Sequence, residues 1–165
     1  ERRELAATGM LRSAAMAGND EEVILAATAV LTDTKVAPEL ENEARYYRAQ
    51  SLVKVNQMAH AVADWQSLAQ DTRNAYGAEA KYQLAQYLFD TGKTADAEKE
   101  VLNYLEVSTP HTYWLARSFV LLSDIYAKLD RKLEARQYLL SLKQNYQADD
   151  DIAGMIESRL EKLNE

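Results

Sequence analysis

The stretch that decides the fold is Trp114–Tyr146, WLARSFVLLSDIYAKLDRKLEARQYLLSLKQNY. Its apolar residues recur at intervals of three and four, the spacing that places side chains on one face of a helix. Asp130 interrupts this pattern near the middle, and aspartate is one of the few residue types that tolerate the left-handed backbone conformation that often ends a helix. The stretch therefore predicts two helices joined by one tight turn.

The same interruption recurs along the chain at Gly18, Asn56, Gly92 and Asp130, which are 38, 36 and 38 residues apart. Such a period indicates repeated helix pairs. We call these four residues the predicted helix stops. Five residues after each stop comes a small or short side chain, which lets two helices cross closely. These residues are Val23, Ala61, Ala97 and Ala135.

Small residues also recur on the helix before each stop. Ala85 stands twelve residues before Ala97, and Ser123 twelve before Ala135, so we expect each pair to touch across the two helices. Larger apolar residues keep the same period and should fill the space between paired helices. They are Leu52, Leu88 and Tyr126 on the first helices, and Trp65, Leu68, Val101, Tyr104, Leu139 and Leu142 on the second.

The whole chain is predicted to be all-α, in a single domain over residues 1–165. Two prolines and five glycines are too few to interrupt the helices often. Pro38 and Pro110 each precede a helical pattern, at a position where the N–H that proline lacks would make no helical hydrogen bond. The predicted helices span 3–17, 20–34, 39–55, 58–71, 76–91, 94–107, 111–129, 132–146 and 151–163.

Trp114–Tyr146 and Ala80–Tyr104, AKYQLAQYLFDTGKTADAEKEVLNY, resemble the tetratricopeptide repeat family. Residues 44–70 match less well, and the first unit departs, since Leu11 replaces the small residue and Ala14 the large one. The resemblance implies a right-handed α-α superhelix of about four helix pairs with a concave groove for a peptide or protein. The implied repeats lie near 4–34, 42–73, 78–109 and 113–146, followed by a capping helix over 151–163.

The long repeat spacing, HTYWLARSF at His111–Phe119 and the ending 143–146 resemble the tetratricopeptide proteins of bacterial cell envelopes, including barrel-assembly lipoproteins. That resemblance implies a periplasmic or outer-membrane-associated location. The chain opens without methionine, already in a helical pattern, and closes on a charged helical run. We therefore expect it to be part of a longer repeat protein.

Composition argues against several classes of partner. A net charge of −7 repels nucleic acid on average. Apolar runs such as Phe119–Leu122 are far shorter than the roughly 20 residues that span a bilayer, so we expect no membrane insertion of this segment. No cysteine is available for a disulfide, a thiolate nucleophile or a zinc ligand.

Residues that could suggest a metal, phosphate or ligand site are explained more simply by structural roles. Asp149–Asp151 could hold a cation, but acidic residues before a helix are expected to cap it. His60 and His111 stand 51 residues apart, and the glycines are scattered singly, so neither a histidine metal pair nor a phosphate loop is predicted. Trp65 and Trp114 are expected in the core. We therefore predict no catalytic residue, no cofactor and no metal, and a protein that is not an enzyme.

One face of the predicted first helices is a candidate partner-binding groove, because acid, tyrosine, glutamine and apolar residues repeat there at the same spacing. Tyrosines on such a face could anchor an extended, basic segment of a partner. The alternative is that Tyr46 and Tyr82 pack between neighbouring first helices. The groove residues are Glu43, Tyr46, Gln50 and Val53, then Glu79, Tyr82, Gln86 and Phe89.

The next pair has Arg117, Val120, Asp124 and Ala127 at these positions, so the predicted groove fades toward the C-terminus. The leading functional hypothesis is a scaffold that binds another protein. A purely structural spacer within a longer solenoid is the alternative, and a helical regulatory or enzyme domain is the remote one. A spacer should show unpatterned charge on its inner surface, which separates it from a scaffold.

Overall fold

The computed structural model describes residues 2–33 and 35–165, without the side chain of Arg3. Within these ranges the chain is all-helical, as predicted, and most helix bounds lie within one residue of those expected. The predicted end of the second helix at Thr34 lies outside the described residues. The helices are α1 (Arg2–Ala17), α2 (Asp20–Thr32), α3 (Pro38–Lys54), α4 (Met58–Leu68), α5 (Ala75–Asp90), α6 (Thr94–Glu106), α7 (Thr112–Lys128), α8 (Lys132–Asn145) and α9 (Ile152–Leu163).

Local sequence explains where several helices begin. The Asn19 side chain accepts a hydrogen bond from the Glu22 backbone N–H at 3.3 Å, and thereby caps α2. Asn74 caps α5 by accepting from the Tyr76 N–H at 2.8 Å. Pro38 is the first residue of α3, where its missing N–H breaks no helical hydrogen bond.

The four predicted stops all adopt the left-handed conformation. The φ angles of Gly18, Asn56, Gly92 and Asp130 are 69°, 60°, 83° and 60°. In each case the backbone reverses within a few residues and the next helix starts, which confirms the periodic turn expected from the sequence.

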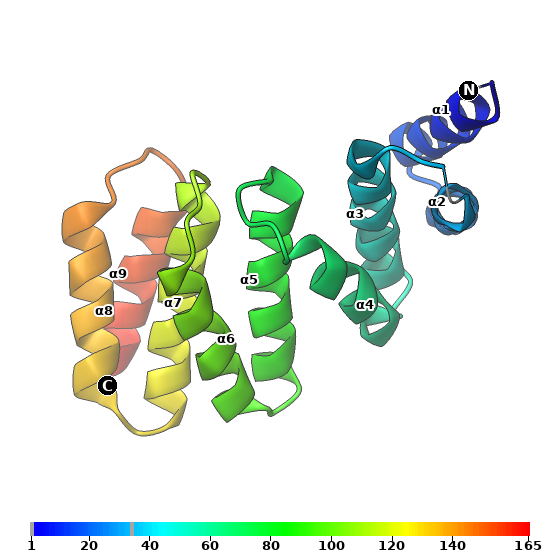
Figure 1. Cartoon of the computed structure of the whole chain (residues 1–165). Helices are drawn as coiled ribbons and strands as arrows, with labels where there is room; N and C mark the ends of the chain where they lie inside the picture. Colours follow the sequence, from blue (N-terminus) through cyan, green and yellow to red (C-terminus); the bar gives the residue numbers. More distant parts are fainter. Residues whose placement is uncertain (1, 34) are drawn as a thin grey trace. The chain divides into compact units, whose positions relative to one another are not determined.

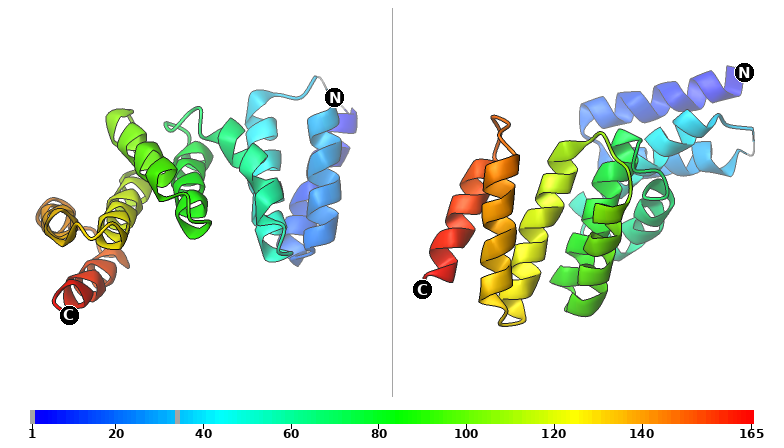
Figure 2. Two further views of the ribbon diagram at one scale, coloured as in Figure 1. Left: turned by 90° about the horizontal axis from the view of Figure 1, so that it is seen from below. Right: turned by 60° about the vertical axis from the view of Figure 1, so that its left-hand side comes forward.

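The chain divides into two compact units, Glu1–Asp71 and Thr72–Glu165, which are described separately. In the first unit α2 packs against both α1 and α3, and α4 packs against α3. Its helices are drawn from blue to teal in Figure 1 and again in Figure 2. A core of mostly small aliphatic residues joins α1, α2 and α3. Its buried members are Leu11, Ala14, Val23, Ala26, Ala27, Val30, Leu40 and Ala44.

In the second unit α7 packs against α5, α6, α8 and α9, and is the helix on which this unit is built. Figures 1 and 2 show α7, α8 and α9 side by side. The core contains larger side chains, among them Tyr82, Leu121, Ile125, Leu139 and Ile156. Its last layer comes from α9, whose Ile152 and Leu163 are buried while its outer face is polar, as expected of a capping helix.

The small residues predicted where paired helices cross are buried. Ala61, Ala97 and Ala135 are completely buried. Ala85 and Ala97 belong to the same core, as do Leu139 and Leu142, while Trp65 is also buried. Among the described residues, no helix has both the length and the apolar character needed to cross a membrane.

Candidate partner-binding surface

A groove of about 360 Å³ runs between α1 and α3 in the first unit, and it contains Glu43, the first residue of the predicted site. Among the described residues, three carboxylates and one guanidinium line it, so this lining has a negative formal charge. The buried Leu40 and the exposed Leu5 add apolar surface. The described lining residues are Glu4, Leu5, Thr8, Arg12, Ala37, Glu39, Leu40 and Glu43.

Glu43 and Arg12 form an ion pair across this groove. Arg12 Nε and Nη2 donate to the two carboxylate oxygens of Glu43 at 2.7 and 2.9 Å. The hydrogen bond from Arg12 holds the pKa of the Glu43 carboxyl below its usual value, although partial burial opposes the shift. The side chain of Glu43 is 15% exposed and that of Arg12 is 60% exposed, so the guanidinium lies at the open rim.

Tyr46 and Gln50 follow Glu43 along the same helix. The Gln50 amide donates to the Tyr46 hydroxyl at 2.8 Å. The Tyr46 ring, which is half-buried, meets Tyr47 edge to face with 5.6 Å between ring centroids. Gln50 is exposed and Val53 is half-buried. These residues follow Glu43 along α3, beyond the lining of the groove, and the tyrosine is only partly accessible.

The matching residues of the second unit are more enclosed. Tyr82 is 4% exposed, so the expectation of an accessible tyrosine ladder is wrong at this position. Its ring stacks on Trp114 of α7 at 5.5 Å between centroids, which is the structural alternative that the sequence left open. Glu79, Gln86 and Phe89 are half-buried. Lys128 Nζ lies 5.2 Å from the centroid of the Phe89 ring.

A chain of hydrogen bonds connects Tyr82 to the following helices. Arg117 donates to the Tyr82 hydroxyl at 2.7 Å and to the Tyr113 hydroxyl at 3.1 Å. Tyr113 donates in turn to Asp151, and Tyr82 donates to Gln86 at 3.0 Å. Burial raises the pKa of the Tyr82 hydroxyl, and the nearby Arg117 charge limits that rise. These polar groups bind one another and tie α5 to α7 and to the start of α9.

Arg48 and Asp64 form an ion pair that sequence reasoning missed. Asp64 of α4 is 1% exposed and accepts from Arg48 Nε at 2.8 Å and from Nη2 at 2.6 Å. Arg48 also donates to Thr28 of α2 at 3.2 Å. The hydrogen bond to Asp64 raises the pKa of Arg48 against the effect of burial. The sequence feature that points to this ion pair is the position of Asp64, three residues after Ala61 on a face that is otherwise apolar.

The other polar residues noted in the sequence have structural contacts. The Asp150 carboxylate accepts from the Ile152 backbone N–H at 2.9 Å, so Asp150 rather than Asp151 caps α9. His111 Nε2 lies 2.9 Å from the Arg73 carbonyl oxygen, and His60 is exposed. No group of three or more potential metal-ligating side chains occurs in the part of the chain that the structure describes.

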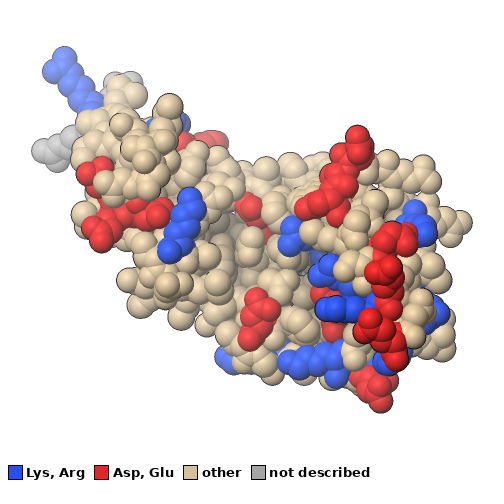
Figure 3. All heavy atoms as spheres, turned by 180° about the vertical axis from the view of Figure 1, so that it is seen from behind, with Lys and Arg blue, Asp and Glu red and all other residues tan. Residues whose placement is uncertain are grey.

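Acidic and basic side chains lie beside one another over the C-terminal helices on the face drawn in Figure 3. The fold and the site together define an all-α protein of repeated helix pairs. A groove whose described lining is acidic lies between α1 and α3, the first helices of the first two pairs. No family model, curated protein or solved structure matches the chain.

Proposed function

We propose that the chain is a non-catalytic scaffold of tetratricopeptide-like helix pairs that binds an extended, basic segment of a partner protein. In this proposal the pairs belong to a right-handed superhelix, within a longer protein associated with the bacterial envelope. Binding occurs in the α1–α3 groove and continues along α3 past Glu43 to Tyr46 and Gln50.

The observation that carries this proposal is the composition of the groove wall. Glu4, Glu39 and Glu43 line it, while Arg12, the one cation among the lining residues that the structure describes, is already bonded to Glu43. A lysine or arginine of a bound segment would be attracted to the two remaining carboxylates, and its apolar neighbours would contact Leu5 and Leu40. Tyr46 offers the edge of an aromatic ring at the next turn of α3.

The second unit fits the spacer alternative better. Its corresponding face is held by the Tyr82, Arg117, Tyr113 and Asp151 network, and by Arg159 of α9, which donates to Asp124 of α7 at 3.1 Å. A bound segment would have to replace hydrogen bonds that the unit already makes. We therefore assign partner binding to the first unit and a structural role to this face of the second.

Fluorescence anisotropy tests the proposal with a labelled, proline-containing peptide that carries lysine at regular positions, since proline keeps the probe extended. Glu39→Lys places a cation in the exposed part of the groove. It should raise the dissociation constant by about tenfold, equivalent to roughly 1.4 kcal/mol. Added salt should weaken binding of the original chain.

The matched control is Glu161→Lys, which makes the same charge change on the exposed face of α9. Affinity should be nearly unchanged in this variant. A peptide with glutamate in place of lysine should bind poorly. Equal losses in both variants, or equal binding of both peptides, would show that the total charge of the protein and not the α1–α3 groove determines binding.

A further inference from the structure

Large apolar side chains on the outer face of the first helix pair, α1 and α2, are unusually exposed. Met10, Met16 and Leu25 are 66%, 90% and 72% exposed. Together with Leu5, these α1 and α2 residues are four of the five most exposed large hydrophobic side chains in the described chain, the fifth being Leu133 on α8. Contiguous exposed apolar surface of this kind marks interaction sites in soluble proteins.

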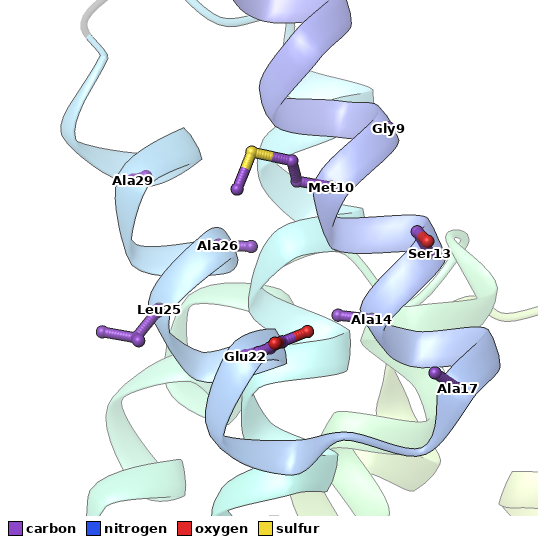
Figure 4. Close-up of a pocket in the computed structure, with 9 residues that line it drawn as sticks. All are labelled: Gly9, Met10, Ser13, Ala14, Ala17, Glu22, Leu25, Ala26 and Ala29. Carbon is purple, nitrogen blue, oxygen red and sulfur yellow. The ribbon is translucent and has the colours of Figure 1, made fainter.

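The face is hollow as well as apolar. A groove of about 600 Å³ lies between α1 and α2. Figure 4 shows Met10 reaching from α1 toward α2 across this space, with Leu25 pointing outward from α2. Small side chains at Gly9, Ser13 and Ala17 form one edge of the groove, one helical turn apart. A helix could therefore approach the α1 backbone closely here.

Charge is scarce on the α1 part of this face. Apart from Arg12, which is bonded to Glu43 on α3, the exposed residues between positions 5 and 17 are uncharged. The capping helix α9 is different, because Glu157, Glu161 and Lys162 are all exposed. The outer face of α1 thus has the composition of a surface that another helix covers.

We propose that a second copy of this chain covers this face, with the two α1 helices antiparallel across a two-fold axis near Gly9 and Ser13. The arrangement places the small residues of both copies at the crossing point and the larger Met16 side chains toward its ends. An antiparallel pair also sets the N-terminal end of each helix dipole beside the C-terminal end of the other. Of the residues assigned to this interface, Leu5 alone also belongs to the described lining of the α1–α3 groove.

Charge at the ends of α1 favours a second copy over an unrelated helix. The exposed Arg2 begins α1, and the exposed Glu21 and Glu22 lie in the first turn of α2, just beyond the C-terminal end of α1. In the antiparallel arrangement, Arg2 of each copy lies near the acidic turn of the other. The same face thus supplies both members of the ionic contact, as an isologous interface requires.

The available area suits a weak dimer. Helices of 16 and 13 residues are about 24 and 20 Å long. Side by side they present roughly 500 Å² per copy, so two copies reach the ~1,000 Å² that separates specific interfaces from incidental contacts. Because this area is at the lower limit, we expect the dimer to be weak and its population to depend on protein concentration.

Sedimentation velocity over a concentration series measures this association directly. The unaltered chain should change from monomer to dimer as its concentration rises. Leu25→Glu should raise the dimer dissociation constant at least about tenfold, because each dimer would carry two carboxylates against apolar surface. Leu133→Glu is the matched control, since Leu133 is 71% exposed on α8. It should dimerise like the unaltered chain.

Cysteine crosslinking tests the geometry, because the chain has no cysteine of its own. Ser13→Cys should be joined by a short bismaleimide into a covalent dimer, whereas Ala153→Cys, on the exposed face of α9, should form no covalent dimer under the same conditions. Circular dichroism should show that all four variants stay folded, since the changed side chains are exposed.

Several results would overturn the proposal. One is a chain that stays monomeric up to submillimolar concentration, which would leave the face to a helix from another protein or from another part of the longer protein proposed above. Another is a dimer that Leu133→Glu weakens as much as Leu25→Glu, which would place the interface elsewhere. Crosslinking of Ala153→Cys in preference to Ser13→Cys would likewise exclude the antiparallel α1 arrangement.

Discussion

Arg117 contacts Tyr82 in two ways. One guanidinium nitrogen donates to the tyrosine hydroxyl at 2.7 Å, and the guanidinium carbon lies 4.8 Å from the centroid of the ring. The contact joins α7 to α5 across 35 residues of sequence. It makes Tyr82 part of the core of the second unit, and it gives the two predicted groove tyrosines different roles.

Substitutions at the two tyrosines should therefore have unequal effects on stability. Tyr82→Ala should destabilise the protein by about 3–5 kcal/mol, the range for truncating buried aromatic side chains. Tyr82→Phe should cost about 1.5–3 kcal/mol, because it removes a hydrogen bond to a charged group. Tyr46→Phe removes the hydrogen bond from the exposed, uncharged Gln50 amide and should cost less. Urea denaturation followed by circular dichroism measures these differences; equal effects at both positions would contradict the assignment of Tyr82 to the core.

Asp64→Ala should be among the most damaging single substitutions in the first unit. It leaves the half-buried Arg48 guanidinium without its bidentate carboxylate, a change that typically costs about 3–5 kcal/mol for a buried pair. Arg48 is partly solvated, so the lower end of that range is expected. Glu157→Ala breaks an ion pair with Lys143 in which both side chains are more than half exposed, and should leave the melting temperature nearly unchanged.

The Arg12–Glu43 pair should make stability depend on acid pH. Because the folded state lowers the Glu43 pKa below its ordinary 4.5, the pair stabilises the fold above that pH and is lost as pH falls through the folded-state pKa. Glu43→Gln should thus be less stable by about 0.5–1 kcal/mol near neutral pH, a modest value because Arg12 is largely exposed. In denaturation experiments the difference should shrink as pH falls below 4.5 and vanish at a pH where the carboxyl is protonated in the folded state as well. A difference that persists there would mean that the carboxylate acts by packing alone.

The same substitution should have opposite effects at two glycines. A methyl group at Gly92 or at Gly154 would meet no atom within 4 Å, so only backbone conformation differs. Gly92 has a φ of 83°, where alanine is strained, and Gly92→Ala should destabilise by about 1–2 kcal/mol. Gly154 lies within α9, and Gly154→Ala should stabilise by about 0.5–1 kcal/mol. Thermal melts of the two variants should shift in opposite directions.

The sequence predicted features that depend on near neighbours in the chain. Gly92 and Asp130 had to end helices because few residue types adopt their backbone conformation, and Ala97 and Ala135 had to be small because two helices cross there. The environment of Tyr82 could not be predicted in this way. Periodicity places a tyrosine on a face of its helix, but its exposure depends on whether Trp114 and Arg117 reach it from another pair.

The groove was predicted in part for a similar reason. Glu43 was recognised by its position on α3, whereas Arg12 and Glu39 were not, because they belong to a divergent first repeat and to the first turn of α3. Asp64 was missed because an acidic residue at a core position contradicts the apolar pattern used to find helices. Its partner Arg48 is what makes the burial possible.

Separate cores in the two units have a calorimetric consequence. Residues 1–71 and 72–165 each bury their own set of side chains, with alanine and valine prominent in the first and leucine, isoleucine and tyrosine in the second. Larger apolar side chains expose more surface on melting, so the second unit should contribute more than its share of the heat-capacity increment. Two units that melt at different temperatures would absorb heat over a wider temperature interval than a single all-or-none transition does, and the calorimetric enthalpy would exceed the van't Hoff value.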